Sequence, residues 1–385
     1  MRSFHFPWQG VLAILLCLLA IPALPLLAAD AAAPISSGTT FVIFILIAAA
    51  AALSFMRLSE ELNAAILFFG AHAAAWLLLA GVSGNEGKAQ ASFFILIAAA
   101  WLLAWRCVSV LSSMRAHSTA GSYSLRLLIP AIFGVWILII WEAITRGAGV
   151  SLVLLPPPSA IGTRIANSLP TLWIDVRQTI LTSVLIGYII GCASGFAVAI
   201  LADRFAFLRR GLLPISNFVS ALPIIGVAPI MVMWFGFDWQ SKAAVVVIMT
   251  FFPMLVNTVT GLAAAGNMER DLMRTYASSY WQTLFKLRLP AAAPFIFNAL
   301  KINSTLAMIG AIVAEFFGTP MSGMGFRIST ENGRLNLDMV WAEIAVAAIA
   351  GSVFYGIVAI NGDVLASVYP WWADVIQDLF QGIEA

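Results

Sequence analysis

Long apolar runs separated by short polar segments dominate the hydrophobic pattern of this chain. A membrane-spanning helix needs about 20 consecutive apolar residues, because each helical residue adds about 1.5 Å to a path of about 30 Å. Ten runs approach or reach this length. They lie near residues 11–29, 39–56, 62–82, 91–111, 127–145, 178–202, 213–236, 243–265, 291–316 and 339–360. The pattern predicts an all-α integral membrane protein with about ten transmembrane helices.

The composition agrees with this fold class. Of 385 residues, 62% are hydrophobic and 10% are charged, and the mean hydropathy is +0.97, whereas soluble domains carry about a quarter charged residues. The formal net charge is only +2 and no basic stripe is interleaved with aromatic residues, so we expect no nucleic-acid partner. Cys17, Cys107 and Cys192 lie singly in apolar runs, where we expect small buried side chains.

Arginine and lysine residues indicate which loops face the cytoplasm, because positive charge concentrates on that side. Alternate loops are the more basic ones. They hold Arg57, Arg106, Arg115, Arg126, Arg204, Arg209, Arg210 and the polar segment 266–294. The first apolar run also has the features of a signal peptide, since Arg2 precedes a leucine-rich core and prolines follow it. Retention and cleavage of this run are both open.

Small residues between 116 and 122 predict a linker between two parts of the chain. Residues 1–120 would form an additional four-helix bundle, to which we assign no function. The core would comprise residues 126–365, with a short outer-surface helix that follows a proline run and starts at an N-cap, Ser159. In residues 366–385, an apolar helical face of Trp371, Trp372, Val375, Ile376, Leu379 and Phe380 lies opposite Asp374, Gln377 and Asp378, which predicts an amphipathic helix at the membrane surface.

The polar segment 266–290 interrupts the apolar pattern between the eighth and ninth spans. Its sequence predicts two short helices joined by a turn at residues 277–279. Apolar side chains recur at helical spacing in both pieces: Leu272, Met273, Tyr276 and Tyr280 in the first set, and Trp281, Leu284 and Phe285 in the second. Leu289 and Pro290 should end the second helix, because proline cannot donate the next hydrogen bond. We expect a cytoplasmic contact surface.

This hairpin resembles the EAA loop of the membrane subunits of ABC importers. Counted back from Pro290, three positions depart from the family pattern: Asp271 stands for Glu, Met273 for Ala, and Ala277 for Gly. The last departure matters most, because glycine adopts positive φ without steric cost. The run RLPAAAPFIFNALKI at 288–302 resembles the branch for nitrate, sulfonate, taurine, bicarbonate or thiamine-precursor uptake. The likeness covers residues 126–365.

The resemblance implies a six-helix type I ABC importer permease core in a bacterial plasma (inner) membrane. It further implies a homodimer of permeases, a separate cytoplasmic ATPase, and an extracytoplasmic binding protein that docks on the outer loop 317–338. Residues implied in ATPase coupling are Asp271, Met273, Arg274, Tyr276, Ala277, Tyr280, Trp281, Leu289 and Pro290. The chain has no G-x-x-x-x-G-K-[ST] motif, so we expect a transport subunit without catalytic residues, cofactor or metal.

Candidate residues for a translocation pathway lie in the later spans. Pro223 and Pro229 interrupt the seventh span, together with Pro214; irregular backbone at membrane depth is tolerated where protein or a watery cavity surrounds it, although simple kinking is the alternative. The further candidates are Trp234, Asn257, Asn303 and Glu315. Glu315 and Glu343 could line a gate or make packing hydrogen bonds.

A glycine series at 187, 191 and 195 permits close helix approach, either within the chain or across a dimer. Lys301 is the one deep cation that the sequence suggests, and it could extend outward to the membrane surface. An uncharged or heteroaromatic solute therefore fits the Trp, Phe and Met content as well as an anion does. An ion-coupled secondary transporter and a membrane sensor or assembly protein remain alternative functions.

Overall fold

The computed structural model describes residues 7–56, 58–114, 119–220, 222–318 and 321–368, and within these residues the regular structure is helical. Seven helical segments are long and apolar enough to cross a membrane. They are Glu60–Val82, Ala91–Ser113, Gly121–Gly147, Leu169–Arg204, Trp239–Ala263, Tyr280–Glu315 and Leu337–Gly362. Three shorter apolar helices span Trp8–Ala23, Ser37–Leu53 and Ile224–Phe235. The all-α membrane fold class is confirmed.

The chain divides into two compact units, residues 1–163 and 164–385. The main helices in the described part of unit 1 are α1 (Trp8–Ala20), α2 (Ser37–Leu53), α3 (Glu60–Val82), α4 (Ala91–Ser113) and α5 (Thr119–Gly147). Helix α4 packs against α1, α3 and α5. Fully buried alanines on α3 and α4, among them Ala71, Ala75 and Ala99, permit these helices to approach closely. Residue 119 already belongs to α5, so the described part of the expected linker is helical.

Unit 2 is built around α11 (Trp239–Ala263), which packs between α8 (Leu185–Arg204) and α14 (Leu289–Glu315). The glycine series on α8 accounts for part of this packing. A methyl group on Gly187 would lie 2.8 Å from the carbonyl oxygen of Ala243, and one on Gly195 would lie 2.5 Å from that of Phe251. Both distances are too short for real contact, so the glycines serve close packing within the chain.

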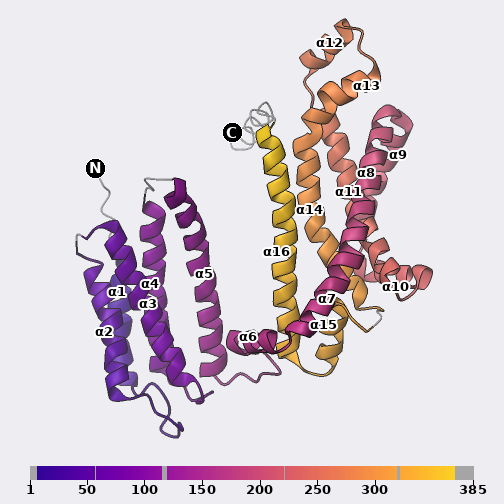
Figure 1. Cartoon of the computed structure of the whole chain (residues 1–385). Coiled ribbons are helices and arrows are strands. Elements are labelled where there is room, and N and C mark those ends of the chain that lie inside the picture. Colours follow the sequence, from indigo (N-terminus) through magenta and orange to yellow (C-terminus); the bar gives the residue numbers. More distant parts are fainter. Residues whose placement is uncertain (1–6, 57, 115–118, 221, 319–320, 369–385) are drawn as a thin grey trace. The chain divides into compact units, whose positions relative to one another are not determined.

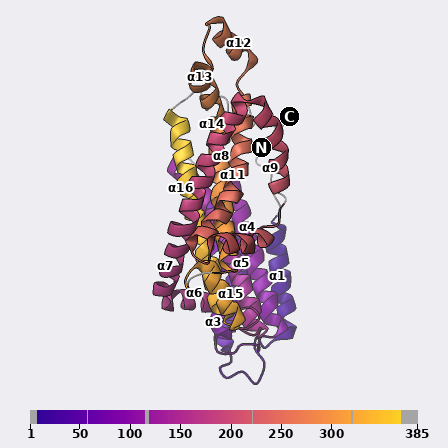
Figure 2. The same ribbon diagram turned by 90° about the vertical axis from the view of Figure 1, so that its right-hand side faces the viewer.

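The expected seventh span at 213–236 is wrong as a single helix. The structure has two helices there, α9 (Ala206–Ser220) and α10 (Ile224–Phe235). Pro223 is the N-cap of α10, whereas Pro214 and Pro229 lie inside helices. The break therefore occurs at Pro223 alone. Figures 1 and 2 both show α10 lying across the direction of α8 and α11.

The two ends of unit 2 carry different elements. At one end α12 (Asn267–Thr275) and α13 (Tyr280–Thr283) project beyond the long helices (Figure 1), and α15 (Met324–Gly333) lies at the opposite, distal end. Helix α16 (Leu337–Val368) runs between these ends (Figure 2) and packs on α14 and α15. Residues 366–368 belong to α16. The rest of the predicted C-terminal surface helix falls at 369–385, outside the described residues.

A short helix follows the proline run, as expected: α6 spans Pro158–Asn167. The expectation that Ser159 is its N-cap is wrong, because the helix already begins at Pro158. Ser159 instead directs its backbone N–H and its hydroxyl to the carboxylate of Glu142. A carboxylate on the preceding helix thus takes the place of a local capping side chain.

Candidate functional site

The turn of the 266–290 hairpin has a defined hydrogen-bond pattern at the end of α12. The N–H of Ala277 donates to the carbonyl of Arg274 over 2.9 Å, and that of Ser278 to the carbonyl of Met273 over 3.0 Å. This pair of bonds is the Schellman motif, whose C′ residue adopts left-handed backbone and is usually glycine. Ala277 occupies that position with φ of 52°. The structure thus gives a physical reason for the family's glycine.

Replacing Ala277 with glycine is expected to stabilise the hairpin. Left-handed backbone costs an alanine about 1 kcal/mol, and part of the gain is offset by the greater freedom of glycine in the unfolded chain. Hydrogen exchange of the peptide covering 272–284 should become slower by up to about fivefold, which corresponds to about 1 kcal/mol. Ala291→Gly, at a helical position, is the matched control and should speed local exchange. Faster exchange in Ala277→Gly would contradict this explanation.

The second helix of the hairpin does not stop at Leu289 and Pro290, so that expectation is wrong. A capping box between Ser279 and Gln282 starts α13. The helix then widens into a π-helical turn, η3 (Leu284–Arg288), and runs on as α14. The N–H of Leu289 reaches the carbonyl of Leu284, five residues back. A widened turn of this kind accommodates the missing N–H and the ring of Pro290 in the first turn of α14.

An apolar face of the hairpin is uncovered in the structure. It comprises Met268 and Leu272 on α12, Tyr276 at the C-cap of α12, and Trp281 and Phe285 on the second helix, all of them exposed; we call these five residues the docking surface. Met268, Leu272 and Tyr276 follow one another at i, i+4 and i+8, and therefore share one face. Tyr276 is 76% exposed and Trp281 58%. Large exposed apolar side chains on such a short polar projection favour a protein-binding surface.

The charged residues of the hairpin have separate roles. Asp271 and Arg274 form an exposed ion pair of 3.3 Å, which contributes little stability by itself. Met273 is partly buried, and its sulfur accepts the Ser278 hydroxyl at 3.9 Å. Arg270 turns back toward α11 and donates to the carbonyl of Ala263 over 2.6 Å. The arginine at the end of α11 also complements the negative end of that helix dipole.

A buried polar group joins the hairpin to the long helices. Arg288 donates two hydrogen bonds, of 2.7 and 2.6 Å, to the carboxylate of Asp203 at the end of α8. Its Nε also donates to the carbonyl of Leu262 on α11 over 3.0 Å. The hydroxyl of Tyr280 donates to the same carboxylate over 3.0 Å. We call Asp203, Tyr280 and Arg288 the base joint.

The base joint changes the expected role of Tyr280, whose hydroxyl and partly buried ring face α8 instead of joining the exposed apolar face. The guanidinium of Arg204 lies 4.9 Å from the centre of this ring. Asp203 had no predicted role, although an acidic residue directly before the basic positions Arg204, Arg209 and Arg210 is a signal that could have identified it.

The residues expected to line a pathway do not meet at one place. Asn303 is fully buried and donates to the carbonyl of Thr250 over 2.8 Å, as a packing bond between α14 and α11. Asn257 donates to the carbonyl of Pro253 in its own helix. Trp234 on α10 is 71% exposed. Behind α10 lies a cavity of about 130 Å³ with an apolar lining that includes Ile224, Val227 and Met249.

Glu315 lies at the distal end, in a hydrogen-bonded contact between α14, α7 (Leu169–Arg177) and the start of α15. Three amides at the N-terminus of α15 donate to side chains: Gly323 to Asp175 over 2.7 Å, Met324 to Thr179 over 2.9 Å, and Gly325 to Glu315 over 2.8 Å. The Thr179 hydroxyl also donates to Glu315. We call residues 323–325 with Asp175, Thr179 and Glu315 the distal latch. It satisfies the free amides and the positive end of the α15 dipole.

Glycine is required on the α15 side of the distal latch. A methyl group on Gly325 would lie 2.1 Å from the carbonyl oxygen of Ile312, and Gly323 has φ of 129°. Arg327 completes the contact by donating to Asp175 over 2.8 Å, and this bond holds the pKa of Arg327 above its ordinary value. The expected loop 317–338 therefore contains the docked helix α15, Met324–Gly333.

Lys242, and not Lys301, has the least exposed cationic side chain among the described residues of unit 2. Lys242 lies in the first turn of α11 and is 1% exposed. Its ammonium donates to the carbonyls of Phe237 and Asp238. Because Lys242 directly precedes the apolar run at 243–265, the sequence favours a loop position for it. The methylene stem instead lies inside the protein, with the charge at the end of the helix.

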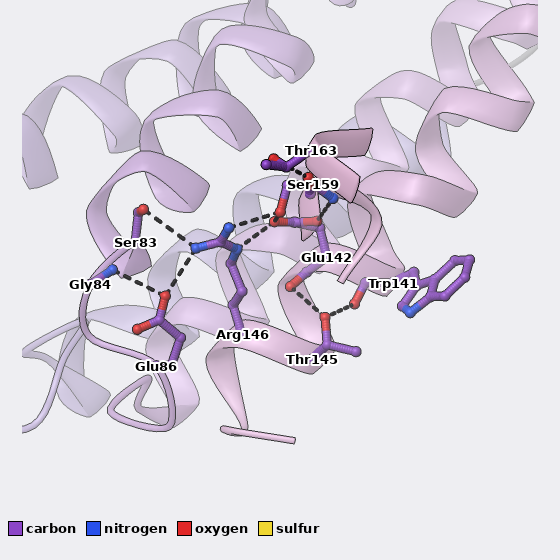
Figure 3. Close-up of polar contacts among 9 residues, drawn as sticks. All are labelled: Ser83, Gly84, Glu86, Trp141, Glu142, Thr145, Arg146, Ser159 and Thr163. Atoms are coloured by element: carbon purple, nitrogen blue, oxygen red, sulfur yellow. Dashed lines mark hydrogen bonds and ion pairs between the residues drawn. The ribbon is translucent and has the colours of Figure 1, made fainter. Parts of the chain in front are cut away.

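Unit 1 has its own polar cluster, centred on Arg146 at the end of α5 (Figure 3). Its guanidinium donates to Glu86 over 2.9 Å and to Ser159 over 2.8 Å, and it forms an ion pair with Glu142. The Glu86 carboxylate accepts its own amide, that of Gly84, and Arg146, and these donors hold the pKa of Glu86 below its ordinary value. The cluster ties the α3–α4 loop and the start of α6 to α5, and it is internally satisfied.

The structure defines a multi-pass membrane protein with a polar hairpin that projects beyond its long helices (Figure 1). Residues 187–367 match the family of binding-protein-dependent transport system inner membrane components. The formylaminopyrimidine transport permease protein of Halalkalibacterium halodurans is 30% identical over 228 residues, which cover 59% of this chain and 90% of the relative. The chain belongs to this family of ABC importer permeases.

Two further relatives show the breadth of the family. The riboflavin transport system permease protein of Chloroflexus aurantiacus is 26% identical over 221 residues, covering 57% of this chain and 82% of the relative. The taurine transport system permease protein of Escherichia coli is 25% identical over 220 residues, covering 55% and 79%. The chain is therefore a transport subunit and not an enzyme, and its family works with an ATPase and a substrate-binding protein.

Proposed function

We propose that the docking surface is the site at which the separate cytoplasmic ATPase binds this permease. The observation that carries the proposal is the uncovered apolar face of Met268, Leu272, Tyr276, Trp281 and Phe285 on a projection that is otherwise polar. Burying such side chains against a partner stabilises a complex by about 1.5 to 3 kcal/mol each. Asp271 and Arg274 flank the face and would set the register of the complex.

The base joint would carry motion from the hairpin to the membrane helices. Arg288 and Asp203 are bound bidentately, a geometry that fixes orientation as well as distance. Arg288 also holds the end of α11 through Leu262. The second helix of the hairpin continues into α14 without a break. A rotation of the hairpin would therefore tilt α8, α11 and α14 together.

We further propose that the transporter contains two copies of this chain, with the pathway between them. Helix α10 supports this arrangement, because Met233, Trp234 and Phe235 are exposed on a helix that lies across the others. An apolar face of this size would be covered by the second copy. In this proposal the seven long helical segments cross a bacterial inner membrane, with residues 1–120 as an additional bundle.

We propose an uncharged or heteroaromatic cargo. The lining of the cavity behind α10 is apolar, including Val245, Phe252 and Leu306, and an ion there would lose hydration without a counter-charge. Two relatives are named for formylaminopyrimidine and for riboflavin. Retention of a small anion by the binding protein that works with this chain would contradict the cargo proposal and leave the docking proposal standing.

A measurement of ATP hydrolysis tests whether the ATPase activity resides in a separate subunit. The purified chain is expected to hydrolyse no ATP, because it lacks a phosphate-binding loop. After reconstitution with its ATPase, hydrolysis should appear, and it should depend on the lysine in the G-x-x-x-x-G-K-[ST] phosphate loop of that partner. Hydrolysis by the purified chain alone would contradict the proposal. Hydrolysis by the reconstituted complex that persists when the phosphate-loop lysine of the ATPase is mutated would contradict it as well.

A further inference from the structure

Glu343 on α16 is the most unusual buried group of unit 2. Its side chain is 0% exposed, and neither of its carboxyl oxygens has a hydrogen-bond partner in the described part of the chain. Much of α16 is outward-facing, with Ile349, Val353 and Ile357 exposed. A charged carboxylate in such a place costs several kcal/mol unless a cation or hydrogen-bond donors compensate it.

The groups that face Glu343 do not neutralise the negative charge of its carboxylate. The charged groups near Glu343 are Asp175 on α7, Arg327 on α15 and Glu315 on α14. Arg327 is already bound to Asp175 over 2.8 Å. Glu315 accepts hydrogen bonds from Thr179 and Gly325. Two further carboxylates therefore surround Glu343, and the adjacent guanidinium is bound elsewhere.

More distant charges are likewise held by their own partners. Glu331 on α15 pairs with Arg334 over 3.1 Å and accepts from Asn336 over 2.7 Å. The ammonium of Lys242 on α11 donates to two backbone carbonyls. Among the described residues no group of three His, Cys, Asp or Glu side chains is placed to hold a metal ion. A proton neutralises the Glu343 carboxylate without any additional ligand.

We propose that Glu343 is a proton-binding site, loaded while the distal latch is closed and emptied when the latch opens. The neutral carboxyl removes the charge that the closed packing cannot compensate. Separation of α15 from α7 and α14 would admit water to the space around the Glu343 carboxyl group. Glu343 would then ionise and release its proton to water.

The direction of the pH effect follows from proton linkage. The closed latch binds one more proton than the open latch, so acid favours closure and a rise in pH favours opening. Above the pH at which the hydrated Glu343 ionises, the closed-to-open ratio should fall by up to tenfold for each pH unit. Transport by this permease would thereby be linked to proton concentration on the distal side.

Hydrogen exchange tests the site in the full-length chain in lipid nanodiscs. The peptide covering 321–336 is followed between pH 6 and 9, and rates are normalised to an unstructured reference peptide at each pH. In the wild-type protein the protection of this peptide should fall with rising pH. In Glu343→Gln, which keeps the shape without the charge, protection should stay high and independent of pH. Glu331→Gln is the control and should retain the wild-type dependence.

Two exchange results would overturn the proposal: wild-type protection that does not change with pH, or an unchanged pH dependence in Glu343→Gln. A measurement on the wild-type protein covers the case in which this variant does not fold. Infrared spectra at neutral pH should contain the C=O stretch of a buried protonated carboxylic acid, and this band should decline as the pH is raised. Absence of the band at neutral pH would overturn the proton site.

Discussion

Replacing Tyr276 and Trp281 together by aspartate is expected to abolish co-purification of the ATPase while the permease stays in the membrane. Both side chains are exposed in the chain alone and would be buried in the complex. Losing two aromatic anchors costs about 4 kcal/mol or more, which corresponds to about a thousandfold in affinity. The two new carboxylates would also have to be desolvated on binding.

The matched control carries the same change at the distal end of unit 2. Met321 and Leu335 are as exposed as Tyr276 and Trp281, at 86% and 62%. Their backbones are left-handed, a conformation that aspartate tolerates. Met321→Asp with Leu335→Asp should leave ATPase association unchanged. Normal association of the Tyr276 and Trp281 double variant would refute the docking surface.

Replacing Asp203 by alanine should have the second-largest effect, through loss of the base joint. The side chains of Arg288 and Asp203 are only 16% and 5% exposed. Removing one member of a buried ion pair leaves the other charge uncompensated and costs about 3 to 5 kcal/mol. Tyr280 would lose its acceptor at the same time. We expect a lower melting temperature and transport that no longer follows ATP hydrolysis.

A mutant cycle separates the pair from its surroundings. Asp203→Asn with Arg288→Gln removes both charges, and the double variant should be more stable than either single variant. Arg274→Ala, which breaks the exposed pair with Asp271, should change stability by less than about 1 kcal/mol. Strict additivity of the Asp203 and Arg288 variants would show that the base joint does not act as a unit.

Local patterns in the sequence predicted the hairpin well. Helical spacing and the turn at 277–279 placed its two helices. The family pattern has glycine where this chain has Ala277, and this difference marked the position as unusual. The structure adds the reason, a Schellman motif closed by Ala277 and Ser278. The glycine series on α8 was also correctly assigned to close helix packing, and the structure selects packing within the chain over the dimer alternative.

Features that depend on tertiary contacts could not be predicted. Pro290 was expected to stop a helix, because no local rule announces the π-helical turn that accommodates it. Tyr280 has apolar spacing, yet it is oriented by Asp203, which is 77 residues away. The distal latch likewise joins Asp175 to Gly323 across 148 residues. Hydrophobic periodicity records which side of a helix is buried, but it does not record which helix covers it.

The most direct test of the central claim places a photoreactive benzophenone amino acid at Tyr276. Illumination of intact cells should cross-link this position to a protein that contains a G-x-x-x-x-G-K-[ST] phosphate loop. The same probe at Leu335, at the distal end, should not capture that protein. Failure to capture a phosphate-loop protein from Tyr276, or its capture from Leu335 instead, would contradict the account of this chain as a permease driven through its hairpin.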